Sequence, residues 1–260
     1  MEYEDILYAE KNGVATITID RPEKHNAFRG RTAEELIHAF GRAGWNQEVG
    51  VIVLTGAGDK AFCSGGDQSA HDAHYDGRGT IGMPIEEMHS VIRDVPKPVI
   101  ARVQGYAIGG GNVLAVLCDL TIASEKAVFG QVGPKVGSVD PGWGTAYLAR
   151  VVGEKKAREI WYLCRRYSAE EALEMGLVNA VVPHDRLDAE VENWCAEILE
   201  RSPTAIAIAK RSINADSEGI RGIGALGLNA LSLYYKTEES KEGVKAFLEK
   251  RRPEFRKYVP

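Results

Sequence analysis

One stretch, Val99 to Asp119 (VIARVQGYAIGGGNVLAVLCD), constrains this chain more than any other. It begins with an apolar run that Gly105 closes, and the apolar pattern that resumes at Leu114 is too long for another tight turn. The pattern predicts a buried strand, a turn at glycines 109–111 and the start of a helix. Because glycine has no Cβ, a ligand can approach this backbone, and the first N–H groups of a helix attract a negative oxygen. A close approach of helix and sheet without any ligand would need the same glycines.

A second unit of the same kind comes earlier in the chain. Val51 to Leu54 is another apolar run, followed by a glycine turn at 56–58 and by AFCSGGDQ at 61–68. Two strand-then-glycine units can each supply one backbone N–H group to a single oxyanion, which is how a carbonyl group is polarised.

Four motifs make the sequence recognisable. They are RPEKHNAF at 21–28, AFCSGGD at 61–67, GYAIGGG at 105–111 and FGQ at 129–131. With these motifs the chain resembles the crotonase (enoyl-CoA hydratase/isomerase) superfamily along essentially its whole length. The resemblance implies an α/β fold, a crotonase-type spiral of β-β-α repeats with a helical C-terminal region. Residues 1–200 would form the spiral core that binds acyl-CoA, and residues 201–260 a helical region for oligomerisation and for completing the active site.

Composition limits the environment and the partners. The chain is 44% hydrophobic and 27% charged, as in an ordinary globular protein, and its net charge of −5 argues against a nucleic-acid-binding surface. No apolar run is long enough to span a bilayer, and the first residues are acidic, so we expect a cytoplasmic protein without a membrane partner. The four cysteines are widely spaced without a C-x-x-C pattern, which favours reduced core thiols and no metal site.

Local patterns predict several flanking elements. The Asn12-Gly13 pair predicts a hairpin between strands at 6–10 and 14–20, and a helix over 32–44 is expected to open with a capping box at Thr32. Residues 69–83 have no apolar period and are read as a mobile loop beside the site, although an ordinary surface loop fits equally well. Beyond Pro183, helices are expected over 190–201, 202–214, 220–235 and 237–250.

The resemblance also implies roles for individual residues. The two oxyanion-binding N–H groups would be those of Gly66 and Gly110. The residues matched to coenzyme A contacts are Lys24, His25, Ala27, Ser64, Asp67 and Gln68.

Hydratases of the superfamily carry two carboxylates that this chain lacks. Val113 and Gly133 stand at those positions, so the acid/base pair that adds water across a double bond is absent. In naphthoate synthases with a glycine at the second position, a bound bicarbonate replaces the carboxylate. We therefore expect a bicarbonate, another small anion or an ordered water beside Gln131 and Gly133, and no other cofactor, because coenzyme A is part of the substrate.

The segment QVGPKVGSVDPGWG at 131–144 offers a replacement. In an extended segment the side chains of Ser138 and Asp140 face the same side, where a carboxylate with a hydroxyl can orient or deprotonate water. Ser-x-Asp before Pro-Gly is also good turn chemistry. The segment, with LYYKTEES at 233–240, is similar to 1,4-dihydroxy-2-naphthoyl-CoA synthase (naphthoate synthase) and to 2-ketocyclohexanecarboxyl-CoA hydrolase. Both use a Ser, an Asp and a Tyr that match Ser138, Asp140 and Tyr235.

Details favour the hydrolase. The synthase reads S-F-D-G-G where this chain has SVDPG at 138–142, and HYDGRGTIGMP at 74–84 and NAFRG at 26–30 look like the hydrolase. The predicted reaction is ring opening of 2-ketocyclohexanecarboxyl-CoA to pimeloyl-CoA in anaerobic degradation of benzoate and related acids. The alternatives are the ring-closing synthase and a non-catalytic acyl-CoA-binding protein, which the loss of both hydratase carboxylates would suit.

The resemblance implies a homo-oligomer, a trimer or a hexamer built from two trimers. A hexamer is expected because Tyr235 and the C-terminal helices would otherwise have no evident role in the active site. The resemblance leaves open whether Tyr235 comes from the same chain or, as in the relatives, from a neighbouring subunit.

Overall fold

The structure is a computed structural model that describes residues 1–71 and 77–258. Two sheets form its centre, a six-stranded sheet in the order β1-β2-β3-β5-β7-β10 and a four-stranded sheet in the order β4-β6-β8-β9. The strands of the larger sheet are β1 (Ile6–Lys11), β2 (Val14–Ile19), β3 (Val51–Gly56), β5 (Val99–Val103), β7 (Leu120–Ser124) and β10 (Ala180–Val182). The smaller sheet contains β4 (Ala61–Cys63), β6 (Tyr106–Ile108), β8 (Val128–Gly130) and β9 (Tyr167–Ser168).

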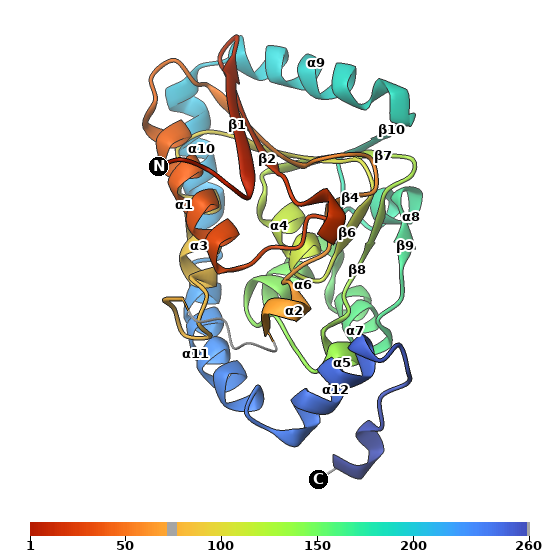
Figure 1. Ribbon diagram of the computed structural model, residues 1–260. Coiled ribbons are helices and arrows are strands. Elements are labelled where there is room, and N and C mark those ends of the chain that lie inside the picture. The colour runs from red at the N-terminus through yellow and green to blue at the C-terminus, as the bar shows by residue number, and fades with distance from the viewer. Residues whose placement is uncertain (72–76, 259–260) are drawn as a thin grey trace.

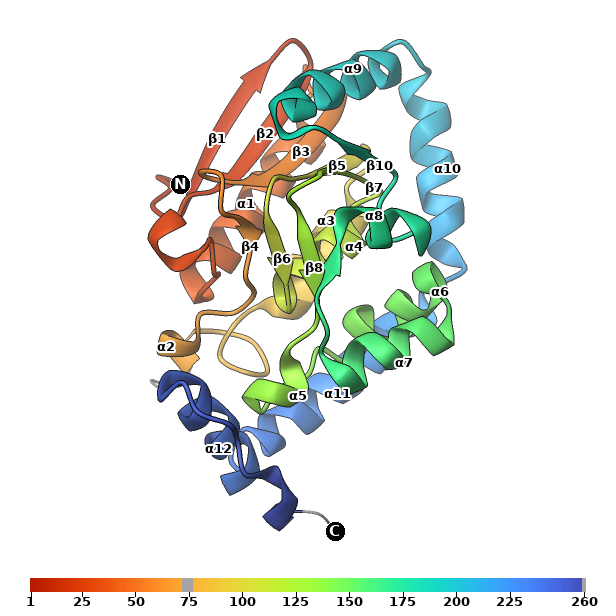
Figure 2. The same cartoon turned by 90° about the vertical axis from the view of Figure 1, so that its right-hand side faces the viewer.

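Successive strands alternate between the two sheets. β3, β5 and β7 pair in parallel in the larger sheet, and the strand that follows each of them, β4, β6 or β8, pairs in parallel in the smaller one. A helical segment then returns the chain to the larger sheet, so each repeat is a β-β-α unit (Figure 2). The predicted α/β class, with a spiral of β-β-α repeats and a helical C-terminal region, is confirmed.

The first hairpin forms as predicted. β1 and β2 are antiparallel with Lys11 opposite Val14, and both turn residues have positive φ, 50° at Asn12 and 80° at Gly13. An Asn-Gly turn of this kind matches the twist of the two strands. Alternate residues of β2 are buried, because only one of its faces meets the core.

The first long helix, α1 (Gly30–Trp45), begins before the predicted start at Thr32. Thr32 is therefore not the residue that caps the helix. Its hydroxyl donates a hydrogen bond of 2.6 Å to Asp5 and accepts one of 3.1 Å from the Arg29 N–H. The capping box predicted at Thr32 was wrong in position, because Thr32 is the third residue of the helix and its hydroxyl accepts from Arg29, the residue at the N-cap.

The remaining helices surround the sheets. α4 (Gly110–Leu117) is buried from Gly111 onward between the sheets and the outer helices, which explains why its sequence is apolar on every side. The other helices of the core region are α2 (Gln68–His71), α3 (Ile85–Asp94), α5 (Gly133–Val136), α6 (Leu148–Val152), α7 (Glu154–Leu163) and α8 (Ala169–Glu174). Short 3₁₀ turns lie at Pro22–Lys24, His184–Arg186 and Phe255–Tyr258, and a π-helical turn lies at Trp143–Tyr147.

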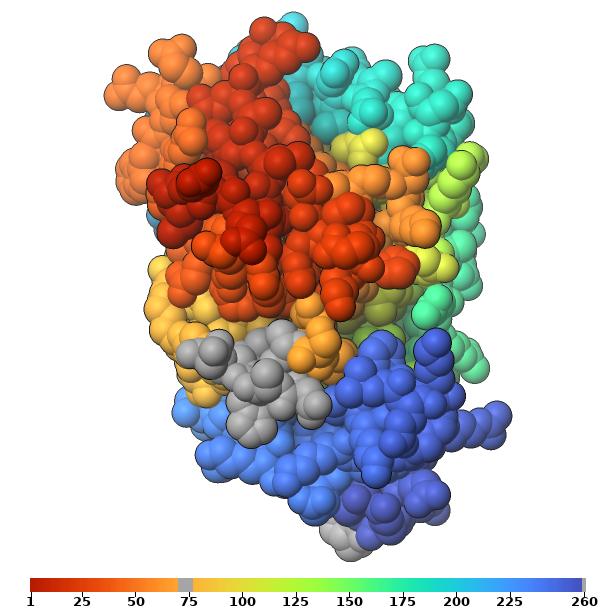
Figure 3. All heavy atoms as spheres, viewed as in Figure 1, coloured from red at the N-terminus to blue at the C-terminus, as the bar shows by residue number. Residues whose placement is uncertain are grey.

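The four predicted C-terminal helices are present, with their ends shifted by a few residues. They are α9 (Leu187–Leu199), α10 (Pro203–Ala215), α11 (Gly219–Tyr234) and α12 (Glu238–Leu248). α9 crosses the upper edge of the large sheet, α10 and α11 run down one side, and α12 lies beside α5 at the lower end (Figure 1). In the space-filling view the blue C-terminal segment closes the lower end of the molecule (Figure 3). Within the described ranges, no helix is long and apolar enough to cross a membrane.

The loop predicted over 69–83 is only partly a loop. Its first residues belong to α2. Residues 72–76, which include the loop's second histidine, His74, lie outside the described residues. The segment from Gly77 to Met83 is turned on itself, because the Gly77 N–H donates to the Gly82 carbonyl at 3.0 Å.

Candidate active site

One cavity of about 1290 Å³ lies between the two glycine turns and the C-terminal helices. The predicted site residues come from distant parts of the chain, and all of them line this cavity. They are Lys24, His25, Ala27, Ser64, Gly66, Asp67, Gln68, Gly110, Gln131, Gly133, Ser138, Asp140 and Tyr235. The fold therefore brings the proposed coenzyme A contacts, oxyanion donors and reactive side chains to one space.

The two glycine turns touch each other. A Cβ on Gly65 would lie 2.9 Å from the Gly110 nitrogen, and a Cβ on Gly110 would lie 2.6 Å from Cζ of Phe28. Phe28 fixes the first turn, because its N–H donates to the Gly65 carbonyl at 2.9 Å and its carbonyl accepts from the Asp67 N–H at 2.8 Å. The close approach requires glycine at both turns.

The N–H groups of Gly66 and Gly110 are available to a ligand. Neither donates a hydrogen bond to any atom in the described part of the chain. Gly110 is the first residue of α4, where an N–H has no partner within the helix. Two cavity-lining donors on touching turns are the arrangement that stabilises a developing oxyanion.

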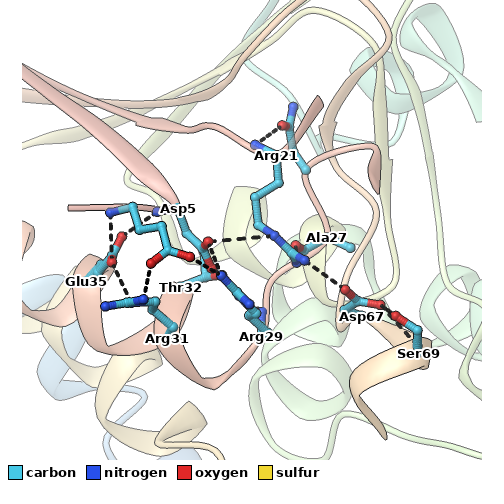
Figure 4. Close-up of polar contacts among 11 residues, drawn as sticks. Asp5, Arg21, Ala27, Arg29, Arg31, Thr32, Glu35, Asp67 and Ser69 are labelled. Atoms are coloured by element: carbon cyan, nitrogen blue, oxygen red, sulfur yellow. Dashed lines mark hydrogen bonds and ion pairs between the residues drawn. The ribbon is translucent and has the colours of Figure 1, made fainter. Parts of the chain in front are cut away.

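An arginine network that the motifs did not predict holds the first glycine turn in place (Figure 4). Arg21 donates to the Asp67 carboxylate at 3.0 Å and lies 3.8 Å from Asp5, which also accepts from Arg29 at 2.8 Å. Burial opposes ionisation of Asp67, but hydrogen bonds from Ser69 and Arg21 outweigh it and hold the pKa of this carboxyl below its usual value. Asp67 thus stays charged and anchors the turn beside Gly66 to the segment at 21–29.

Ser138 and Tyr235 form a hydrogen-bonded pair. The Ser138 Oγ lies 2.8 Å from the phenolic oxygen of Tyr235, which follows the last residue of α11. Burial, together with the nearby Asp140 carboxylate, raises the pKa of Tyr235 to about 12, although the hydrogen bond with Ser138 lowers it. The tyrosine is therefore neutral at physiological pH and carries a proton that it can donate.

Tyr235 enters the cavity of its own chain. Of the two sources left open by the sequence, the same chain supplies the tyrosine in this structure, because α11 and α12 fold back beneath the core. The argument that a hexamer is needed to give Tyr235 a role is therefore lost, and the oligomeric state stays a prediction.

Asp140 combines burial with sparse hydrogen bonding. Its side chain is 14% exposed, and its Oδ1 accepts one hydrogen bond of 3.2 Å from the Gly144 N–H. Burial raises the pKa of Asp140 to about 7, because this single bond only partly offsets the cost of the charge. A carboxylate with such a pKa is suited to general-base catalysis near neutral pH.

A side chain at position 133 would have little room. A Cβ on Gly133 would lie 2.5 Å from the Ser138 carbonyl oxygen and 2.9 Å from the Trp161 ring. Gly133 nevertheless lines the cavity together with Gln131, so the small anion or water expected beside these two residues stays a prediction. Gln131 remains a candidate contact, since its Nε2 is buried without a hydrogen-bond partner in the described ranges.

The other position where hydratases carry a carboxylate is apolar. Val113 is fully buried in α4, and a Cβ on Gly144 would lie 3.0 Å from its Cγ2 and 2.8 Å from Cβ of Asp140. Val113 therefore packs against the turn that carries the Asp140 hydrogen bond.

His89 is a site neighbour for which the sequence offered no signal. It lies on the buried face of α3, its side chain is 3% exposed, and its Nε2 is 3.9 Å from Asp140 Oδ2. Burial lowers the pKa of His89 to about 3, so the imidazole is neutral. A lone histidine among the apolar positions of a helix gives no motif, and only the fold brings it to Asp140.

Comparisons with known proteins agree with this geometry. The model of the enoyl-CoA hydratase/isomerase family matches residues 9–258. An enoyl-CoA hydratase from Mycobacterium avium subsp. paratuberculosis K-10 is 32% identical with a TM-score of 0.88, covering 98% of this chain and 99% of that one. A carnitinyl-CoA hydratase from Mycobacterium avium is 31% identical with a TM-score of 0.84, covering 98% and 100%.

A third solved structure, an enoyl-CoA hydratase from Bacillus anthracis, is 32% identical with a TM-score of 0.74, covering 97% of this chain and 99% of that one. Family model and solved structures thus cover nearly the whole sequence and share its fold. This chain belongs to the enoyl-CoA hydratase/isomerase family and is an acyl-CoA-processing enzyme of that type.

Proposed function

We propose that this enzyme opens the ring of 2-ketocyclohexanecarboxyl-CoA by hydrolysis, producing pimeloyl-CoA. The observation that carries the proposal is Asp140, a carboxylate with a pKa of about 7 on the wall that also presents the Ser138–Tyr235 pair. It provides a base near neutral pH, and a neutral tyrosine beside it provides an acid.

The thioester would bind at the glycine turns. Its carbonyl oxygen would accept hydrogen bonds from the N–H groups of Gly66 and Gly110, each worth about 10² to 10³ in rate in comparable sites. Basic side chains around the cavity suit the phosphates of coenzyme A. They are Lys24, Lys135, Arg165, Arg166, Arg251 and Arg252.

Water would attack the ring ketone while Asp140 removes its proton. The tetrahedral adduct then collapses to a carboxyl group, and the bond between the ketone carbon and the carbon that bears the thioester breaks. The electron pair of that bond moves onto the thioester oxygen as an enolate, held by Gly66 and Gly110. Tyr235 would protonate the enolate carbon, and the proton that Asp140 took from water would then pass to the tyrosinate, so that both groups are restored and one water is consumed per ring opened.

The positions at which this chain departs from hydratases support a different reaction. Val113 is buried against Gly144, and Gly133 carries no side chain, so neither supplies the carboxylate that hydration of a double bond requires. We infer that this protein combines the thioester site expected of its family with a different set of acid/base groups.

The test is an incubation of the purified protein with three substrates, followed by mass spectrometry. 2-Ketocyclohexanecarboxyl-CoA should gain one water and become pimeloyl-CoA, whereas a short enoyl-CoA should not be hydrated. Conversion of o-succinylbenzoyl-CoA would instead support the ring-closing synthase. Binding of acyl-CoA without turnover of any of the three would support a non-catalytic acyl-CoA-binding protein.

A further inference from the structure

Asp140 has an unused acceptor atom and His89 an unused polar atom, and the two face each other. Asp140 Oδ1 accepts from the Gly144 N–H, but no hydrogen bond reaches Oδ2 from the described residues. His89 Nε2 is buried without a partner in the same ranges and lies 3.9 Å from Oδ2. Asp140 lines the cavity, but His89 Nε2 is fully buried, and because a buried polar atom nearly always has a partner, its position beside Oδ2 requires an explanation.

The distance of 3.9 Å is too long for a direct hydrogen bond. Catalytic hydrogen bonds are often long without substrate and shorten in the substrate complex, and a small side-chain rotation would close this gap. His89 is not among the residues that line the cavity, so it approaches Asp140 from behind rather than from the side that water and substrate occupy.

We propose that His89 is a positioning residue for Asp140. In the working enzyme, its Nε2–H donates to Oδ2 and holds the carboxylate in its charged form, ready to accept a proton from water. This proposal rests on the proposed function only for the identity of the substrate. The contact between His89 and Asp140 and its effect on the carboxylate do not depend on which substrate the enzyme uses.

The position of α3 is secured next to this contact. Arg93, one turn after His89, lies over the rings of Trp143 and Tyr147, with its Cζ 4.6 Å from each centroid, and donates to Ser217 at 2.7 Å. Trp143 and Tyr147 are the first and last residues of the π-helical turn that contains Gly144. One face of α3 therefore positions both His89 and Gly144, the two neighbours of Asp140.

Other ionisable groups near α3 are engaged elsewhere, apart from Tyr235, whose phenol lies beside Asp140 and hydrogen-bonds to Ser138. α4 carries no ionisable side chain. On the surrounding elements, Glu34 of α1 and Glu87 of α3 bind Arg78, Arg221 of α11 binds Asp94, and Lys210 of α10 binds Asp119. His89 is therefore the neighbour whose removal should change Asp140 most directly.

The experiment measures the protonation of Asp140 without any substrate. Infrared difference spectra against Asp140→Asn report the carbonyl stretch of the protonated carboxyl group as pH is varied. His89→Leu removes the donor, and because loss of a hydrogen bond to the charged form disfavours it, the pKa of Asp140 should rise by about one unit. His89→Gln keeps an amide N–H at similar reach and should leave the titration near that of the wild type.

Turnover gives a second readout. A rise of one unit in the pKa of a required base lowers kcat/KM about tenfold at pH 6 and changes it little at pH 9. Met88→Leu, a swap at the adjacent buried position of α3, is the control for general disturbance of the helix.

The outcomes are separable. A shifted titration in His89→Leu alone supports the proposal, even if 2-ketocyclohexanecarboxyl-CoA proves not to be the substrate. An unchanged titration, an equal shift in His89→Gln, or an equal shift in Met88→Leu would overturn it and leave His89 as a packing residue.

Discussion

The Ser138 hydroxyl and the Tyr235 phenol lie 2.8 Å apart although 97 positions separate them in the chain. The contact joins the turn that carries Asp140 to the end of α11, and so closes the cavity with the chain's own C-terminal helices. Asp140 and Tyr235, a base and an acid, thereby line the same cavity as Gly66 and Gly110.

Asp140→Asn should abolish turnover and leave acyl-CoA binding nearly intact. Asparagine keeps the size of the carboxylate but cannot take a proton from water at neutral pH. The expected loss in kcat is at least about 10² to 10⁴. Single-turnover kinetics and calorimetric titration separate the two effects, with the exposed Asp185→Asn as the control. Near-native kcat would mean that Ser138 and Asp140 stabilise a turn and that Asp140 is not the base.

Tyr235→Phe should lower kcat far more than it changes KM. The ring and its packing remain, whereas the proton donor and the hydrogen bond to Ser138 are lost. A positioned acid contributes about 10² to 10⁴ in rate. Tyr234→Phe, one residue earlier on the same helix, is the matched control and should leave kcat unchanged. If both variants behave alike, the Tyr235 hydroxyl has no chemical role.

The raised pKa of Asp140 should also appear in stability. The folded protein holds this proton up to about pH 7, whereas the unfolded chain releases it near the ordinary value of 3.8. Between these values the folded state binds more protons, so rising pH lowers the free energy of unfolding, by up to about 1.4 kcal/mol per pH unit.

Asp140→Asn has no such proton to lose. It should therefore gain stability relative to the wild type as pH rises from 4 to 8, by up to about 4 kcal/mol. Urea unfolding at both pH values measures the difference. A stability difference that is the same at pH 4 and pH 8 would mean that the Asp140 carboxyl ionises normally in the folded protein.

Two glycines should respond oppositely to alanine. A Cβ on Gly111 would lie 1.9 Å from the Cys63 carbonyl oxygen, so Gly111→Ala should cost at least about 3 kcal/mol or prevent folding. Gly41 lies inside α1 with nothing within 4 Å of an added Cβ, and Gly41→Ala should stabilise by about 0.5–1 kcal/mol. Thermal unfolding compares them, and equal melting temperatures would contradict the close approach of the two turns.

The outer faces of α10 and α11 should be covered in solution by further copies of the chain. Ile208, Ile213 and Leu226 are largely exposed there, which is costly for apolar side chains gathered on neighbouring helices. We expect a trimer or hexamer by light scattering, and dissociation when Ile213 and Leu226 are replaced by Glu. A monomer at working concentration would contradict this expectation.

The sequence alone determined the parts that depend on local backbone chemistry. An Asn-Gly pair sets the hairpin, glycine runs mark where two segments touch, and apolar periods mark the strands and helices, because each of these signals acts over a few residues. The motif resemblance likewise supplied the set of residues that surround the cavity.

Only the tertiary structure decided how distant side chains meet. Asp5 binds the Thr32 hydroxyl, the Ser138 carbonyl and the Trp161 ring leave no room for a Cβ at Gly133, and His89 approaches Asp140 from a helix with no motif of its own. Such contacts arise when the sheets and helices pack as one core. Burial and neighbouring charge then set the protonation of Asp140 and Tyr235, and no local pattern of residues encodes either quantity.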